Sequence, residues 1–171
     1  MRTAEAAGAD PDDIVSMCSF HCGDGFFAID TRQIREVFGE TTPQRVPLTA
    51  EYIAGVMPYR GAVLTTLSFR ALLGLGNGTG AGCVIVLDDE EPNLQFGLMV
   101  DGVGGVVTMA RNALAPNPSA LDARSMALFC GAYKLHSGLM VRLDPHKLRP
   151  SRLAETNLFE TVNYEGTGVK K

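Results

Sequence analysis

The residues best suited to nucleophilic or metal chemistry are four cysteines and three histidines. Cys18 and Cys22 are the closest cysteine pair, but three residues separate them, where common zinc hooks have two, and no second pair follows. His21, His136 and His146 lie in different segments and have no metal-ligand partner at the usual spacing. The sequence therefore predicts no metal site and no cofactor.

The cysteines lie inside or beside apolar runs, as small apolar residues of a reducing compartment do. One catalytic alternative stays open, a thiol-dependent enzyme that uses Cys22 or Cys83. That alternative predicts a thiol of low pKa next to a basic group.

Glycine-rich and acidic runs are the remaining candidates for ligand sites. Residues 74–78 and 102–105 are rich in glycine, but neither has the Lys-Ser/Thr of a phosphate-binding loop or the context of a dinucleotide site. We interpret them as a linker and a bent strand. The acids of residues 88–91 are consecutive rather than alternating, so we expect a hairpin tip with its acids in solvent.

One feature indicates recognition rather than catalysis. Arg60 and Gly61 separate two apolar runs, which places Arg60 at the tip of a hairpin. A guanidinium there can meet a carboxylate or carbonyl group of a partner, and Tyr59 adds rigid aromatic area.

Composition limits the classes of partner. The chain has 171 residues, a net charge of −4, 46% hydrophobic residues and no tryptophan. An acidic chain without a basic face or aromatic platforms is a poor binder of nucleic acid. No apolar run reaches 18 residues, and residues 1–13 lack an apolar signal region, so we expect a cytosolic protein without membrane insertion.

The elements expected before residue 74 are mostly short strands. Residues 14–20 and 26–29 flank a glycine turn and predict a hairpin, and residues 56–59 and 62–67 predict a second one. Between them, Asp30 can cap a helix whose apolar residues follow at spacings of three and four up to Gly39. Those apolar residues are Ile34, Val37 and Phe38.

A glycine-dense segment, residues 74–82, is the expected boundary within the chain. Beyond it, residues 83–87 and 94–100 predict a third hairpin, which residues 103–109 extend. Residues 128–133 and 139–143 predict a fourth hairpin, and a short helix is expected around residues 151–155.

Strands of about five residues with only brief helices indicate an all-β fold of two small barrels. We expect one domain over residues 14–155. Its first barrel takes residues 14–73 plus the C-terminal helix, and its second takes residues 83–143. Residues 1–13 and 156–171 are expected to be flexible tails.

The order of motifs resembles the CheW-like coupling domain of bacterial chemosensory arrays, from about Ser16 to Arg152. The opening hairpin pattern matches Phe20, Gly23, Phe27, Ala28 and Ile29, and the following motif matches Ile34-Arg35-Glu36-Val37. A central motif matches residues 53–69 around Tyr59-Arg60-Gly61, and a later strand motif matches residues 96–103. The sequence departs from the family at Pro58, Tyr59, Thr65, Ser68 and Gly105.

The resemblance implies two SH3-like five-stranded barrels, no catalytic activity, and a scaffold that links chemoreceptor tips to the regulatory domain of a CheA-type histidine kinase. Other CheW-like domains of an array are further implied partners. It also implies recruitment to membrane-associated receptor arrays, with a type IV pilus or other chemosensory system as the alternative setting.

Site residues are carried over by position. The receptor or kinase interface would use Ile34, Glu36, Val37, Val56, Tyr59 and Arg60. The backbone around a groove between the barrels would be shaped by Gly55, Gly61, Gly97 and Gly131.

Overall fold

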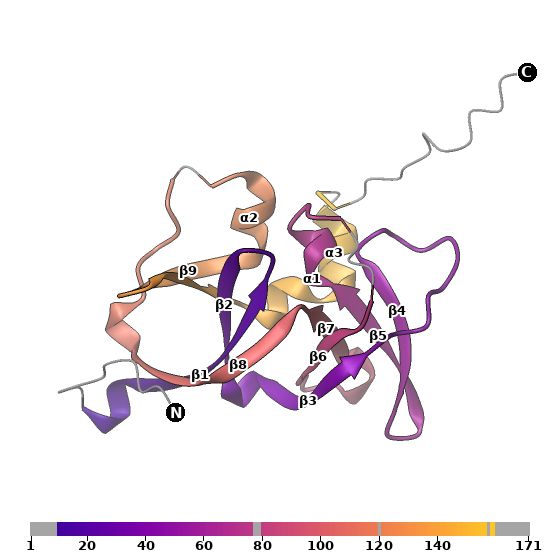
Figure 1. Ribbon diagram of the computed structural model, residues 1–171, viewed down its shortest axis with the longest axis horizontal. Helices are drawn as coiled ribbons and strands as arrows, with labels where there is room; N and C mark the ends of the chain where they lie inside the picture. The colour runs from indigo at the N-terminus through magenta and orange to yellow at the C-terminus, as the bar shows by residue number, and fades with distance from the viewer. Residues whose placement is uncertain (1–9, 77–79, 120, 157, 160–171) are drawn as a thin grey trace, which may run out of the picture.

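Short strand-forming runs separated by turns assemble into two five-stranded sheets. Figure 1 shows how the strands and helices are arranged in space. The computed structural model describes residues 10–76, 80–119, 121–156 and 158–159. Each sheet curls into a small barrel, and the two barrels pack against each other. The fold is mostly β and has the two SH3-like subdomains expected from the sequence.

Barrel 1 has the strand order β8-β1-β2-β10-β9, and barrel 2 has the order β3-β6-β7-β5-β4. The strands of barrel 1 are β1 (Ile14–Cys22), β2 (Gly25–Asp30), β8 (Gly102–Ala110), β9 (Phe129–Leu135) and β10 (Gly138–Leu143). Those of barrel 2 are β3 (Ile34–Thr41), β4 (Ile53–Tyr59), β5 (Ala62–Ser68), β6 (Gly82–Leu87) and β7 (Phe96–Val100).

The two barrels share one pattern of strand pairing, although the chain passes through their strands in a different order. Each contains a single parallel pair, β10 with β2 in barrel 1 and β5 with β7 in barrel 2, among antiparallel neighbours. In each, an isolated bridge ties a loop residue to an edge strand: Ala115 pairs with Ala132 of β9, and Gln44 pairs with Val56 of β4. These bridges draw the open edges of the sheets together, which protects them from pairing with other chains.

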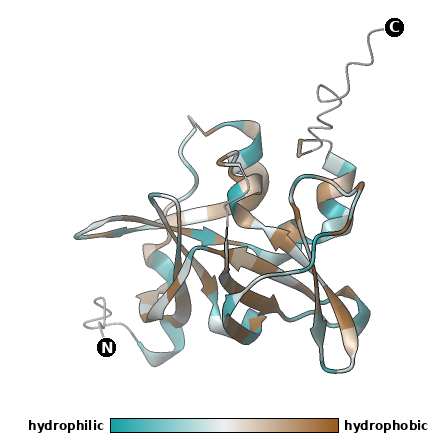
Figure 2. Ribbon diagram, turned by 45° about the vertical axis from the view of Figure 1, so that its right-hand side comes forward, coloured by the Kyte–Doolittle hydropathy of each residue, from teal (hydrophilic) through white to brown (hydrophobic). Residues whose placement is uncertain are grey.

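Three apolar cores hold the molecule together. The largest lies between the barrels and joins strands of both sheets with the three α-helices, so the barrels depend on each other. At its centre Phe69 packs edge-on against Phe20 and Phe27, with ring centroids 5.6 and 4.8 Å apart. Smaller cores fill the interior of each barrel. Figure 2 shows the corresponding hydrophobic colouring along the central strands.

The α-helices are short and gather on one side of the molecule in Figure 1. They are α1 (Phe69–Leu72), α2 (Ala123–Leu128) and α3 (Pro150–Thr156). The C-terminal helix was predicted from the sequence, whereas α2 was not. Five 3-10 turns are also described: η1 (Pro11–Asp13), η2 (Thr31–Gln33), η3 (Pro92–Leu94), η4 (Arg111–Ala113) and η5 (Pro145–Leu148).

The helix expected between Asp30 and Gly39 is wrong. The Asp30 carboxylate does cap a turn by accepting the amide of Arg32, but only η2 forms. From Ile34 onward the chain is β3, because it pairs with β6 over residues 34–41. Burial along β3 alternates with period two, so tertiary pairing overrides the helical spacing of its apolar residues.

The expected division of strands between the barrels is also wrong. Barrel 2 is built from residues 34–100, while barrel 1 combines residues 14–30 with residues 102–143. The glycine-dense segment therefore connects α1 to β6 along the chain of barrel 2 and does not separate the barrels, although its residues 77–79 lie outside the described residues. Turn composition marks where a chain bends, but it does not say which strands pair.

Two further expectations need correction. The acids of residues 88–91 are not all in solvent, because Asp89 has a side chain only 4% exposed and lies 2.6 Å from Arg149. Part of the expected C-terminal tail is also packed, since Thr156 ends α3 and Phe159 is 2% exposed. Residues 1–9 and 160–171 lie outside the described residues.

Candidate partner-binding surface

The β4–β5 hairpin presents Arg60 and Gly61 at a tight two-residue tip. Both residues have positive φ, 48° for Arg60 and 77° for Gly61, as the turn that matches strand twist requires. A Cβ on Gly61 would meet no atom within 4 Å, so its requirement is conformational and not steric. Arg60 occupies a left-handed backbone region that costs a non-glycine residue about 1–2 kcal/mol.

The Arg60 side chain folds over its own hairpin and reaches β3. Its guanidinium carbon lies 5.2 Å from the Tyr59 ring centroid, and its Nη2 lies 3.5 Å from Oε2 of Glu36. Below it the Tyr59 ring meets Phe38 edge-on, with centroids 6.0 Å apart. The hairpin tip thus reaches β3, at the opposite edge of the sheet, and the ion pair and ring contact join the two edges of barrel 2.

Burial separates the two halves of this contact. Tyr59 is 8% exposed, whereas the side chains of Arg60 and Glu36 are 63% and 39% exposed. Burial raises the pKa of the Tyr59 hydroxyl, and the Arg60 guanidinium partly opposes this. The Glu36 carboxylate, which interacts with this hydroxyl, raises its pKa further. A buried aromatic platform therefore supports an exposed pair of opposite charges.

The other proposed interface residues lie at different places in barrel 2. Ile34, at the start of β3, is half-buried and packs against the central core. Val37 is 41% exposed and lies on the other face of β3, since residues three apart on a strand point in opposite directions. The structure therefore does not join Ile34 and Val37 into one apolar stripe. Glu36, Tyr59 and Arg60 are the three that it brings together.

Val56, the sixth residue, lines a shallow pocket of about 360 Å³ on the same barrel, together with Pro58 and Val63. Val63 is 74% exposed, and the sequence analysis missed it. It lies opposite Pro58 in the hairpin register. The predicted turn at Arg60 and Gly61 fixes the register of this hairpin, and that register could have identified Val63 as the residue opposite Pro58.

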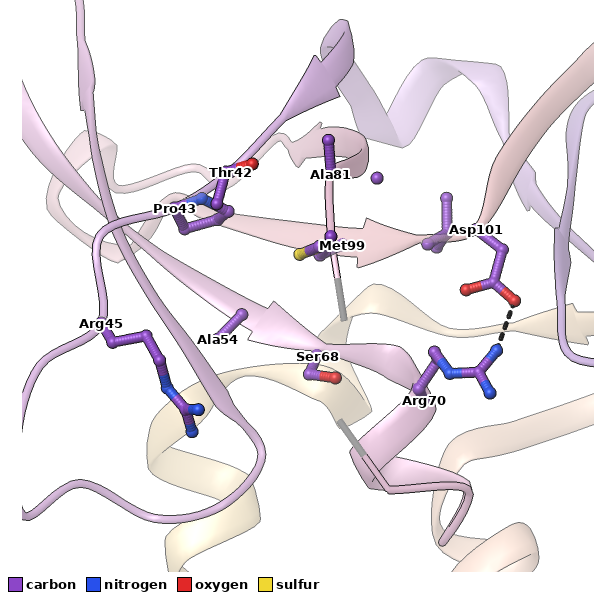
Figure 3. A pocket seen from close by; sticks show the side chains of 12 residues that line it. Thr42, Pro43, Arg45, Ala54, Ser68, Arg70, Ala81, Met99 and Asp101 are labelled. Carbon is purple, nitrogen blue, oxygen red and sulfur yellow. Dashed lines mark hydrogen bonds and ion pairs between the residues drawn. The ribbon is translucent and has the colours of Figure 1, made fainter. Parts of the chain in front are cut away.

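A larger pocket of about 550 Å³ lies where β5, β6 and β7 meet the loop after β3 (Figure 3). Asp101 stands at its rim and accepts hydrogen bonds from Arg70 Nη1 at 2.6 Å and from the Gly23 amide at 2.7 Å. Ser68, one of the positions at which the sequence departs from the family motif, accepts the Ala71 amide at 3.2 Å and so caps α1. The departure at this position therefore keeps a helix-capping group.

The four glycines proposed to shape a groove have clear local requirements. Gly55 and Gly131, at φ of 150° and 146°, occupy equivalent places beside the two isolated bridges, where a Cβ would strike Gln44 or Ala115. A Cβ on Gly97 would meet Val84 at 2.7 Å. These requirements, together with the positive φ of Gly61, allow the strands and loops of each barrel to approach one another closely. The groove-shaping role remains a prediction.

The cysteine environments do not favour the thiol-enzyme alternative. Cys22 is 1% exposed, and burial, with a contribution from the Asp101 carboxylate, raises its pKa to about 12. Burial raises the pKa of Cys18 and Cys130 as well. A nucleophilic thiol needs the opposite shift. Among the described residues, no group of three potential metal ligands is found, and no helix is long and apolar enough to span a membrane.

Two SH3-like barrels on a shared core, with an exposed charged tip over a buried tyrosine, define a two-barrel β protein suited to protein recognition. Comparison with known proteins agrees with this class. The family model of the CheW-like domain matches residues 16–152, so the chain belongs to the CheW-like domain family.

Individual relatives carry the same description. A chemotaxis protein CheW of Rhizobium meliloti (strain 1021) is 24% identical over 139 residues, which is 81% of this chain and 90% of that protein. A probable chemotaxis protein CheW of Rhizobium etli is 28% identical over 102 residues, or 60% of this chain and 66% of that one. The crystal structure of the scaffolding protein TtCheW from Thermoanaerobacter tengcongensis superposes with a TM-score of 0.66 at 20% identity, covering 76% of this chain and 88% of that chain.

Proposed function

We propose that the chain is a non-enzymatic adaptor of bacterial chemosensory signalling that couples chemoreceptor tips to the regulatory domain of a CheA-type histidine kinase. Family membership supports the adaptor role. The observation that carries the proposal to residues is the Glu36–Arg60 pair, held in solvent above the buried ring of Tyr59.

The energetics of this pair favour binding over stability. An exposed ion pair contributes about 0–1 kcal/mol, less than the cost of a left-handed backbone at Arg60. A site that lowers the stability of its own fold is typical of a functional surface.

The surroundings suit a protein partner. Val63 on β5 and Val37 on β3 are exposed apolar residues of the same barrel, and arginine and tyrosine are typical anchors of interfaces. In the proposed arrangement barrel 2 offers this surface to the kinase or the receptor, and the protein works at receptor arrays in the cytoplasm. Other CheW-like domains are further partners in this proposal.

The test is a charge exchange at the pair. Arg60→Glu places two carboxylates together and should reduce co-sedimentation with receptor-containing membranes and a CheA-type kinase by about tenfold. The far-UV spectrum should be unchanged, and the melting temperature should stay within a few degrees because the side chain is exposed. The double variant Arg60→Glu with Glu36→Arg restores the pair in reverse and should recover part of the binding.

Arg152→Glu is the matched control, an exposed arginine on α3, and should bind as the wild-type chain does. Normal array assembly by a folded Arg60→Glu protein would refute the site. Pull-down from native cells tests the function independently, because a CheA-type kinase and methyl-accepting receptors should be recovered together. The accompanying receptors also distinguish a flagellar setting from a type IV pilus or other chemosensory system.

A further inference from the structure

The chain continues past the part that matches the CheW-like family, and this continuation is packed. The family match ends at residue 152, within α3. Seven residues further on, Phe159 is 2% exposed and belongs to the central core. Its neighbour Leu158 is 38% exposed. An aromatic side chain is therefore buried beyond the end of α3.

Two side chains form the slot that holds Phe159. The Tyr52 ring stands edge-on to it, with centroids 6.4 Å apart and planes at 80°. On another side the Arg124 guanidinium carbon lies 5.2 Å from the Phe159 ring centroid. Edge-to-face rings and a guanidinium over a ring face are both favourable arrangements. The slot is thus shaped for an aromatic side chain.

Hydrogen bonds to backbone carbonyl groups fix both walls. The carbonyl of Tyr52 accepts the Ser68 amide at 2.7 Å, which ties the Tyr52 wall to the end of β5. Arg124 Nη2 donates to the Ala71 carbonyl at 3.3 Å, and its Nε is buried with no hydrogen-bond partner among the described residues. The ring of Phe159 therefore covers a guanidinium that is only partly satisfied.

The walls come from different barrels. Tyr52 leads directly into β4 of barrel 2, whereas Arg124 lies in α2, which leads into β9 of barrel 1. Phe159 itself follows α3, which continues from β10 of barrel 1 through η5. The side chain therefore meets both barrels at the same point.

We propose that Phe159 is a C-terminal latch, which closes an aromatic slot between Tyr52 and Arg124 and holds α3 and α2 in place against barrel 2. Release of the latch would free α3 and open the slot while the strands of both barrels stay paired. The occupant of the slot is the chain's own Phe159. This inference does not depend on the proposed adaptor function.

The test compares adjacent residues in the full chain, Phe159→Ala against Leu158→Ala. Trypsin cleavage after Arg152, an exposed residue within α3, reports local opening. Phe159→Ala should accelerate that cleavage about tenfold or more, because it empties a buried aromatic site. Leu158→Ala should leave the rate within about twofold, because Leu158 is partly exposed.

Hydrogen exchange separates a latch from an ordinary core residue. In Phe159→Ala, amides of α2 and the Ser68 amide should lose protection while amides of β1 and β2 keep theirs. The milder variant Phe159→Leu should give an intermediate cleavage rate if the alanine variant does not fold. Equal cleavage of the Phe159 and Leu158 variants, or a uniform loss of protection that includes β1 and β2, would overturn the proposal.

Discussion

Closure of barrel 2 at Gly55 gives a prediction whose size follows from the structure. Gly55 has a φ of 150°, and a Cβ built on it would strike the carbonyl of Gln44. That carbonyl accepts the Val56 amide at 2.8 Å, and the Gln44 amide donates to Val56 at 2.8 Å. Gly55→Ala therefore strains the backbone and separates the segment that carries Gln44 from β4.

The expected loss of unfolding free energy in Gly55→Ala is the sum of two contributions. A side chain at a positive φ costs about 1–2 kcal/mol, and the two backbone hydrogen bonds contribute about 1 kcal/mol each. The free energy of unfolding should fall by about 3–4 kcal/mol, and the melting temperature by roughly 6–16 °C for a chain of this size. Thermal melting followed by far-UV circular dichroism, with urea unfolding as a second measurement, gives both values.

Gly39→Ala is the control in the same barrel, because a Cβ there meets no atom within 4 Å. It should melt within a degree or two of the wild-type protein or slightly above it. If Gly55→Ala has the same melting temperature as Gly39→Ala, the close contact between Gly55 and Gln44 does not stabilise barrel 2, and the reasoning is refuted.

Two other predictions concern ionisable groups. Asp30→Asn should lower the free energy of unfolding by about 1–2 kcal/mol at pH 7, because the hydrogen-bonded Arg32 holds the pKa of the Asp30 carboxyl below its usual range. That stabilisation is present above the pKa of the carboxyl in the unfolded chain and is lost as the pH falls through its pKa in the folded chain. The urea midpoints of the wild-type protein and Asp30→Asn should therefore converge in acid. A constant difference between the two midpoints from pH 7 to pH 2 would contradict the prediction. Cys22, with its pKa raised to about 12, should resist iodoacetamide at pH 8 until the chain unfolds, while the half-buried Cys83 reacts before it. Peptide mass spectrometry measures the order of labelling, and early labelling of Cys22 would contradict the prediction.

Local patterns predicted most of the strands. The four hairpins were found because each joins apolar runs through a glycine, charged or polar turn, and the tip at Arg60 lies where the sequence placed it. The fold class followed from strand length and number. The features that could be predicted, hairpins and their turns, are therefore those that depend on about ten neighbouring residues.

The errors arose where distant residues decide the structure. Ile34, Val37 and Phe38 have helical spacing, and only the pairing of β3 with β6 makes them a strand. Glu36 lies beside Arg60 because the barrel closes, which spacing along the chain does not reveal. Phe159 was placed in a tail because its neighbours are polar, and its burial depends on Tyr52 and Arg124 far away in the sequence.

The strand membership of the barrels has a consequence for synthesis. Barrel 2 uses one continuous stretch, so its strands can pair as soon as residue 100 has left the ribosome. The β1–β2 hairpin is made first, yet its partner β8 emerges later, and the hydrogen bond from Ser19 to Gly105 joins residues 86 positions apart. The β1–β2 hairpin must therefore wait without its partner strands while barrel 2 folds. Strands β8, β9 and β10, made last, complete barrel 1, which β1 and β2 began.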